Sequence, residues 1–352
     1  MASVVVQVGQ CGNQIGRMFW DISLNDNQNL TGHVYVNGDE KLRSVNIDTE
    51  PKVIRKLQNT DSKRVLRDGN LVVGRKGRGC NWALGYHGSS KQGSEGDSLE
   101  VAMDVLRKEI ERCDHFSGVI MLHSLSGGTG AGLGSHLCEL IRDEYPMHEM
   151  LNCAVTPHSH GESPLQHYNS LLCLAWLQRY SDGVVLFHND EVLSLQENRR
   201  QKKCDVHHIN KHIAECLCHL LLPVADVTPS SGVSIGLEPW QMLRSVCPMP
   251  ALKLLHVTQA TASKTVLQNL ASQLTRTLRR RGSNNQTYSS LANLCVARGS
   301  GEVTFPSNLQ QVESHLTSAY NCVKWNPQPI DFWFGNICLD CLVIFIVITF
   351  SL

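Results

Sequence analysis

The glycine-rich stretch SLSGGTGAGLGS, residues 124–135, most constrains the fold of this chain. It has five glycines in twelve residues, between an apolar segment, GVIMLH, and a helical pattern, HLCELIRDEYP. A strand, a glycine turn and a helix bring backbone N–H groups and the positive end of a helix together, which suits a phosphate. We predict a phosphate cradle formed by Ser124, Gly127, Gly128, Thr129, Gly130 and Gly132. A tight turn without a ligand is the alternative.

Two familiar phosphate motifs are excluded in this stretch. No GK[ST] follows the glycines, so it is not a Walker A loop. Ser135 stands where GxGxxG would need its third glycine, which argues against a dinucleotide-dependent oxidoreductase. The compound that is bound must therefore be identified from other residues.

Strand and helix patterns alternate over the first two thirds of the chain. Residues 3–8, 118–123, 151–157 and 183–190 are rich in β-branched and other apolar residues, and 97–113 and 168–180 have helical periodicity. The motif GQCGNQIG is expected to be a turn that leads into a helix, and residues 58–78 are expected to be irregular. This alternation predicts an α/β fold with a parallel, Rossmann-like sheet whose ligand lies at the carboxyl ends of the strands. We expect a nucleotide-binding domain over 3–222, a smaller α+β domain over 223–337, and an apolar tail over 338–352.

Composition excludes several classes of function. The formal net charge is zero, so nothing indicates bulk attraction to nucleic acid or to an anionic membrane. The N-terminus has no signal-peptide pattern, and the fourteen cysteines are expected to be free thiols. The apolar run CLVIFIVITFSL is too short to be a membrane-spanning helix, which needs about 20 residues.

Six motifs together resemble the tubulin superfamily. They are GQCGNQIG (9–16), DTEP (48–51), CNWALG (80–85), SGGTGAGLGS (126–135), HYNSLL (167–172) and VKWNP (323–327), in tubulin order over residues 3 to about 337. The chain is similar to the divergent delta, epsilon and zeta tubulins. This resemblance implies a GTP-binding cytoskeletal protein of the cytoplasm, a structural component of centrioles or basal bodies with other tubulins as partners.

The resemblance also implies roles for individual residues. Gln10 and Cys11 would lie under the nucleotide phosphates, with Asn81 in a further phosphate loop. Asp48 and Glu50 would hold Mg²⁺, which prefers oxygen ligands.

Asn189 and Asn210 would pair with the guanine edge, since an amide offers both a donor and an acceptor. GTP or GDP is therefore expected, and ATP is not.

Several positions depart from the family pattern. Cys80 replaces an asparagine, Ser126 a glycine, and Gln166 the acid before YN. Val206 stands where an aromatic ring normally stacks on the base, with His207 beside it as a substitute. Losing a stacking ring costs about 1–3 kcal/mol, so we expect weak nucleotide binding.

Features concerned with assembly also differ. Gln241 stands where α-tubulin carries the glutamate that completes its neighbour's GTPase site, so at most a weak GTPase is expected and no catalytic residue is assigned. Pro239 should open a helix and leave Glu238 near its cap. The basic stretch LTRTLRRRGSNN forms either a patch for acidic tubulin surfaces or a solvated loop.

The end of the sequence also departs from tubulins. The covering helices that follow VKWNP in tubulins have no counterpart, and the tail is expected to be aberrant and exposed. A tubulin-like scaffold without nucleotide, or a non-functional truncated isoform, is the alternative to a GTP-binding subunit.

Overall fold

The computed structural model folds into two compact units, unit 1 (Met1–Glu215) and unit 2 (Cys216–Leu352). The division falls inside helix α8 (Val206–Leu221), whereas the sequence placed the domain boundary after residue 222. The structure describes residues 2–25, 34–58, 65–88, 98–161, 163–200, 204–223, 238–262, 289–298, 309–335 and 342–351. The basic stretch 274–285 lies outside them.

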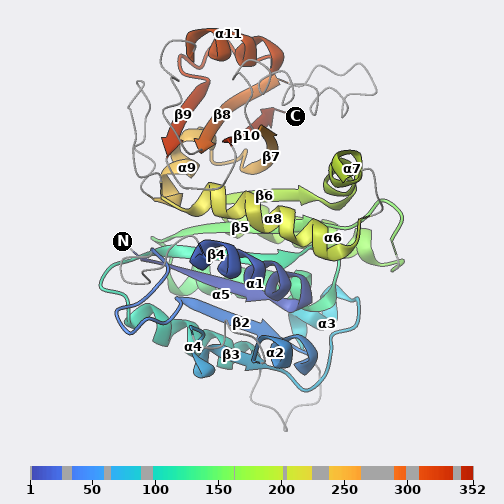
Figure 1. Ribbon diagram of the computed structural model, residues 1–352. Helices are drawn as coiled ribbons and strands as arrows, with labels where there is room; N and C mark the ends of the chain where they lie inside the picture. The colour runs from blue at the N-terminus through green and yellow to red at the C-terminus, as the bar shows by residue number, and fades with distance from the viewer. Residues whose placement is uncertain are drawn as a thin grey trace. The chain divides into compact units, whose positions relative to one another are not determined.

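Unit 1 contains a parallel sheet, as the sequence predicted (Figure 1). Every neighbouring pair in it is parallel, in the order β3-β2-β1-β4-β5-β6. The strands are β1 (Ala2–Val8), β2 (Ser44–Asp48), β3 (Leu71–Val73), β4 (Phe116–Ser124), β5 (Glu149–Thr156) and β6 (Gly183–His188). In a parallel sheet all carboxyl ends meet at one edge, and this edge carries the candidate site.

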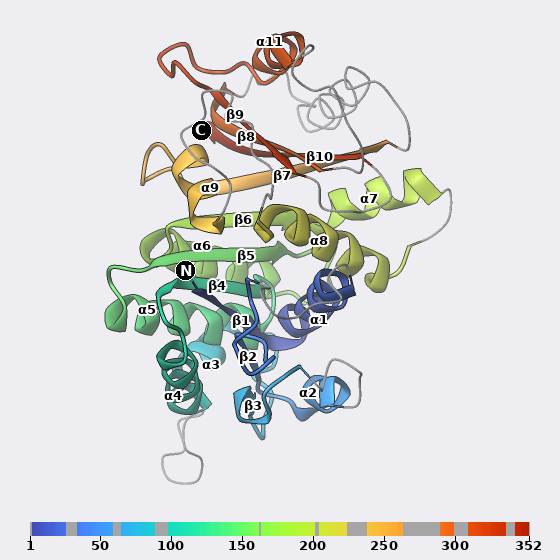
Figure 2. The same cartoon turned by 60° about the vertical axis from the view of Figure 1, so that its left-hand side comes forward.

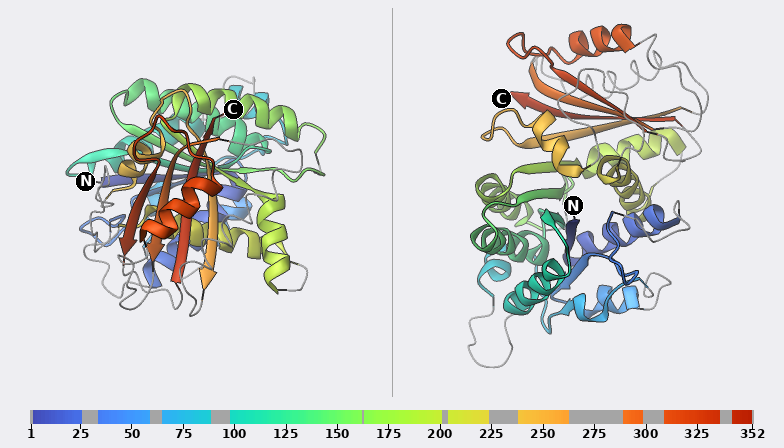
Figure 3. Two further views of the ribbon diagram at one scale, coloured as in Figure 1. Left: turned by 90° about the horizontal axis from the view of Figure 1, so that it is seen from above. Right: turned by 90° about the vertical axis from the view of Figure 1, so that its left-hand side faces the viewer.

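Helices cover both faces of this sheet (Figure 2 and Figure 3, right). Helices α4, α5 and α6 lie on one face, and α1 and α2 lie on the other. The helices of unit 1 are α1 (Gly9–Asn25), α2 (Pro51–Gln58), α3 (Trp82–His87), α4 (Ser98–Glu111), α5 (Gly134–Glu144), α6 (Gln166–Tyr180), α7 (Asn189–Arg200) and the first part of α8. The segment η2 (Asp68–Asn70) is a short 3₁₀-helix, and η3 (Gly128–Leu133) is a short π-helix. A core of Val4, Val6, Val119, Met121 and Leu137 packs between sheet and helices.

The first helix begins earlier than the sequence suggested. The motif GQCGNQIG was expected to be a turn, but α1 begins at Gly9, directly after β1. Gly9 has φ of +73°, a conformation that glycine adopts without a steric penalty. One residue therefore makes the whole turn, and Gln10 and Cys11 lie on the first turn of α1.

Unit 2 contains a mixed sheet in the order β7-β10-β8-β9. Its strands are β7 (Leu254–Ala262), β8 (Ser289–Arg298), β9 (Ile330–Gly335) and β10 (Leu342–Ser351), and its helices are the end of α8, α9 (Pro239–Val246) and α11 (Leu309–Ala319). Helices α11 and α9 lie on opposite faces of the sheet (Figure 3).

The apolar tail is not separate from this fold. As β10 it pairs antiparallel with β7 on one side and β8 on the other, whereas the sequence had suggested an exposed, aberrant end. In the described part of the chain, no helix has the length and apolar character needed to cross a bilayer.

Candidate functional site

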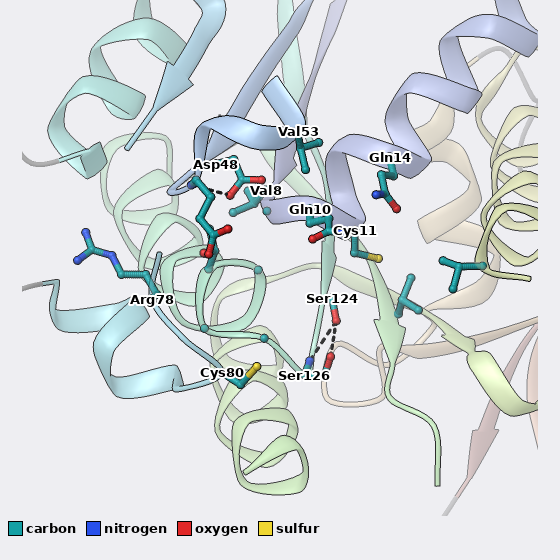
Figure 4. A pocket seen from close by; sticks show the side chains of 18 of the residues that line it. Val8, Gln10, Cys11, Gln14, Asp48, Val53, Arg78, Cys80, Ser124 and Ser126 are labelled. Atoms are coloured by element: carbon teal, nitrogen blue, oxygen red, sulfur yellow. Dashed lines mark hydrogen bonds between the residues drawn. The ribbon is translucent and has the colours of Figure 1, made fainter. Parts of the chain in front are cut away.

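A pocket of about 510 Å³ opens at the carboxyl edge of the parallel sheet (Figure 4). Val8, Ser124 and Val155 bring the ends of β1, β4 and β5 to its wall. Asp48 ends β2, and Asn189 directly follows β6. Five strands of unit 1 therefore contribute to one cavity, as expected for ligand binding in an open α/β sheet.

Backbone and small side chains line one end of the pocket. Gln10 and Cys11 come from the first turn of α1, and Gly127, Gly128, Thr129 and Gly130 come from the glycine loop. A Cβ on Gly128 would lie 2.6 Å from the Arg78 carbonyl oxygen, so the loop needs glycine there. At Gly127 an added Cβ would meet nothing within 4 Å. This end suits a phosphate chain, because its backbone N–H groups are not screened by side chains.

Short hydrogen bonds fix the glycine loop to its neighbours. Thr129 and Thr49 share a hydrogen bond of 2.6 Å between their hydroxyls, and Ser124 and Ser126 share one of 2.8 Å (Figure 4 shows the serine pair). The buried Asn169 donates to the carbonyls of Cys80 and Ser126 and accepts from the backbone N–H of Trp82. Asn169 therefore ties the glycine loop to the loop before α3 and does not line the cavity.

Asp48 and Glu50 place two carboxylates beside this end of the pocket (Figure 4 labels Asp48). Asp48 is only 4% exposed, and its Oδ1 accepts from the Glu50 backbone N–H at 3.1 Å. Its Oδ2 is buried without a hydrogen-bond partner. Burial, and then the nearby charge of Glu50, raise the pKa of Asp48 to about 6.

These carboxylates fit a magnesium ion. A buried, unpaired carboxylate oxygen is costly, and a cation would satisfy it. Mg²⁺ in nucleotide sites is commonly held by one or two carboxylates together with phosphate oxygens. Among the described residues, no group of three or more His, Cys, Asp or Glu side chains is arranged to hold a metal alone.

The opposite end of the pocket carries amides and apolar side chains. Asn189 begins α7, and Asn210 and Ile209 come from α8. The Asn210 amide nitrogen donates to Gln14 Oε1 at 3.1 Å, which holds the amide in one orientation. Val206 also lines the pocket and is 62% exposed, so no ring covers a ligand at that position.

Two of the site residues that the sequence predicted, Gly132 and Asn81, do not line the cavity. Gly132 is buried in η3, where an added Cβ would lie 2.2 Å from the Trp82 carbonyl oxygen. The other residue is Asn81. Its Oδ1 accepts from the backbone N–H groups of Ala83 and Leu84, so it caps α3. Cys80, one residue earlier, lines the pocket instead. The predicted residues in the lining are Gln10, Cys11, Asp48, Glu50, Ser124, Gly127, Gly128, Thr129, Gly130, Asn189 and Asn210.

Several lining residues were not predicted. Lys52 and Arg78 bring positive charge, and Gln14 and His158 bring further hydrogen-bonding groups. The basic run GRKGRGC gave a signal for Arg78, since cations beside a glycine loop suit phosphate. His158 lies in the polar loop after β5 and had no comparable signal.

Gln241 lies in unit 2, on α9. Glu238 occupies the N-cap position and Pro239 the first turn, as predicted, and the Gln241 backbone N–H donates to the Glu238 carbonyl. Trp240, Met242 and Leu243 are buried around it. The buried neighbours hold the backbone of Gln241 in place.

Comparison with known proteins identifies the family. Residues 2–197 match the Tubulin/FtsZ family, GTPase domain. The tubulin delta chain of Homo sapiens is 31% identical over 289 residues, which are 73% of this chain and 60% of that protein. The nucleomorph tubulin beta chain of Guillardia theta is 34% identical over 211 residues, 54% of this chain and 47% of that protein.

The tubulin delta chain of Macaca fascicularis is 32% identical, again over 73% of this chain and 60% of the relative. The chain thus spans about 60% of the length of the delta relatives that it matches. The match to the family's GTPase domain covers more than half of the chain, and it coincides with the sheet and glycine loop described above. The chain belongs to the Tubulin/FtsZ family, within which it is similar to tubulin delta chains.

Proposed function

We propose that the pocket of unit 1 binds a guanine nucleotide together with Mg²⁺. The observation that carries the proposal is the gathering of the glycine loop, the two carboxylates and the two asparagines around one cavity. The phosphates would lie against Gly127–Gly130 and the first turn of α1. Asp48 and Glu50 would hold Mg²⁺, which when bound neutralises charge on the phosphate oxygens.

Base selection rests on Asn189 and Asn210. Guanine offers an acceptor and donors on its edge, and an amide side chain matches both kinds of group. Gln14 accepts from the Asn210 amide nitrogen, so the Asn210 Oδ1 remains as the acceptor for guanine N–H groups. Adenine lacks the matching pattern, so GTP and GDP should bind in preference to ATP.

At the level of the cell, the proposal is a structural, tubulin-type subunit. Membership of the Tubulin/FtsZ family supports a cytoskeletal role with other tubulins as partners. Similarity to tubulin delta chains supports the more specific assignment to centrioles or basal bodies that the sequence motifs implied. Membranes and nucleic acids are not part of this role.

Analysis of the nucleotide in the purified protein tests the proposal. The protein is denatured, and the supernatant is separated by ion-exchange chromatography. We expect about one GTP or GDP per chain in wild type and a loss in Asp48→Asn purified with Mg²⁺. An Asn81→Ala variant, altered outside the pocket lining, serves as the control and should retain nucleotide. A folded protein that binds no GTP when it is added would instead indicate a scaffold without nucleotide.

A competition assay tests the base. GTP should displace a labelled guanine nucleotide at a much lower concentration than ATP does. Asn189→Ala should reduce this difference between the displacing concentrations of GTP and ATP. Equal displacement by GTP and ATP would refute guanine selection and leave phosphate binding intact.

A further inference from the structure

The order of strands predicts which part of a nucleotide each loop meets. The glycine loop follows β4, and Asn189 follows β6, with β5 between them in the sheet. If the phosphates lie at β4 and the base at β6, the sugar lies at the carboxyl end of β5. The residue that lines the pocket there with a polar side chain is His158, two residues after β5 ends.

His158 is held in a fixed orientation. Its Nδ1 lies 2.6 Å from Asp190 Oδ1, and the other Asp190 oxygen accepts from the Ser159 backbone N–H at 2.7 Å. The Gln166 amide donates to the His158 carbonyl at 3.0 Å. Side chain and backbone are therefore both tied down, from α7 and from the start of α6.

The hydrogen bond to Asp190 also sets the chemistry of the other ring nitrogen. A carboxylate can only accept, so Nδ1 carries the proton in this contact. In the neutral ring Nε2 is then an acceptor, and none of the described residues forms a hydrogen bond with it. The side chain is 38% exposed, so a ligand can reach this nitrogen.

We propose that His158, oriented by Asp190, recognises the sugar of the bound nucleotide by accepting a hydrogen bond from a ribose hydroxyl. His158 is then a specificity residue, and Asp190 is a positioning residue that acts through it. The inference rests on the guanine-nucleotide site proposed above and extends it to recognition of one of the two ribose hydroxyls.

The test compares affinities for GTP, 2′-deoxy-GTP and 3′-deoxy-GTP, measured with Mg²⁺ by calorimetry. Wild type should bind one of the deoxy analogues roughly two- to tenfold more weakly than GTP, the range for one net hydrogen bond. His158→Ala should weaken the binding of GTP by that factor and leave the affinity for the deoxy analogue unchanged. The ratio of the affinity for GTP to the affinity for the deoxy analogue therefore approaches one. Asp190→Asn should reduce the ratio by a smaller factor.

His160→Ala is the matched control, because His160 is an exposed histidine on the same loop that does not line the pocket. It should keep the wild-type ratio. A wild-type ratio that survives His158→Ala, with GTP still bound, would overturn this inference alone. A folded wild type that binds none of the three nucleotides would overturn the proposed function and this inference with it.

Discussion

Units 1 and 2 build their sheets in opposite ways. In unit 1 every strand pair is parallel, and the glycine loop joins a strand directly to a helix. In unit 2 the last strand, β10, enters between β7 and β8, whose sequences lie far upstream. The match to the family's GTPase domain, residues 2–197, falls entirely in unit 1.

This difference separates local from long-range determinants. Unit 1 is built from strand–turn–helix motifs, and each motif can be predicted from a short segment of the sequence. Unit 2 depends on strand pairing between residues far apart in the sequence. Val343 of β10 pairs with Arg298 of β8, more than forty residues upstream, and the residues of β7 that pair with β10 lie farther upstream still. Long-range pairing of this kind costs loop-closure entropy and leaves little local signature. Changes in the two units should therefore have separable effects.

The largest effect is expected from removal of the tail strand. Deleting residues 342–352 leaves the facing edges of β7 and β8 without partners, so unit 2 should lose its protease-resistant fold. The single change Ile346→Pro, opposite Thr258 and Cys295, should act in the same direction, because proline removes a donor from a central strand. Ile346→Val is the control and should be tolerated. Limited proteolysis with mass spectrometry measures the protease resistance of each unit separately.

The sequence had led to the contrary expectation of an aberrant, exposed tail, and the deletion of an exposed apolar segment relieves aggregation. If the truncated chain keeps a resistant unit 2 and aggregates less, the pairing of β10 is wrong. Nucleotide binding by unit 1 in the truncated protein would sharpen the comparison, since it would show that the site needs unit 1 alone.

The next effect concerns the position of Gln241 on α9. We expect that wild type does not stimulate phosphate release from GTP-loaded β-tubulin, because an amide is not a carboxylate base. General-base help is typically worth about 10²–10⁴-fold, so Gln241→Glu should raise the rate by about 10² or more. Gln241→Ala should behave as wild type does. Wild-type release as fast as with an α-tubulin partner, unchanged by Gln241→Glu, would refute the idea.

Much of unit 1 could be predicted from sequence, for physical reasons that particular residues show. The β-branched run of β1 and the apolar face of α4 reveal buried elements through their periodicity. The start of α1 was missed, because the φ of +73° at Gly9 has no signature beyond the glycine itself. Strand β3 was missed in a polar stretch, since three residues are too few to show alternation.

The residues of the candidate site could be predicted only where a sequence motif determines the conformation of the backbone. Residues 127–130 of the glycine loop, and Asp48 and Glu50 of the DTEP motif, line the pocket, whereas the Asn81 side chain caps α3. Asparagine suits both uses, and sequence alone does not separate a cap from a ligand. His158 depends on a contact with Asp190, 32 positions away, which only the fold reveals.

A matched pair of glycines tests how tightly the loop of unit 1 is built. Gly128→Ala would force a Cβ to 2.6 Å from the Arg78 carbonyl and 2.9 Å from that of Gly79. Overpacking against backbone should cost about 3 kcal/mol in unfolding free energy and weaken nucleotide binding. Gly127→Ala, one residue earlier, has open space and a φ of −91°, so it should leave stability nearly unchanged. Equal urea midpoints for the two variants would contradict this packing of the loop.

The smallest expected effect is a pH dependence in unit 2. His219 on α8 is 2% exposed, and burial, followed by the charge of Arg298, lowers its pKa from 6.5 to about 3. Arg298 is itself buried, and it donates to the carbonyls of His219, Leu222 and Pro223 at the end of α8. A protonated His219 would place a second cation beside it. Unfolded chains therefore bind more protons than folded ones between pH 3 and 6.5, so stability falls as the pH drops below 6.5. At pH 5 the loss of unfolding free energy is roughly 2 kcal/mol.

Hydrogen exchange of the β8 amides at pH 7 and 5, corrected for intrinsic rates, measures this loss of stability locally. His219→Gln should flatten the dependence, whereas His207→Gln, at an exposed position on the same helix, should not. A steep dependence that survives His219→Gln would show that another group in unit 2 takes up the proton.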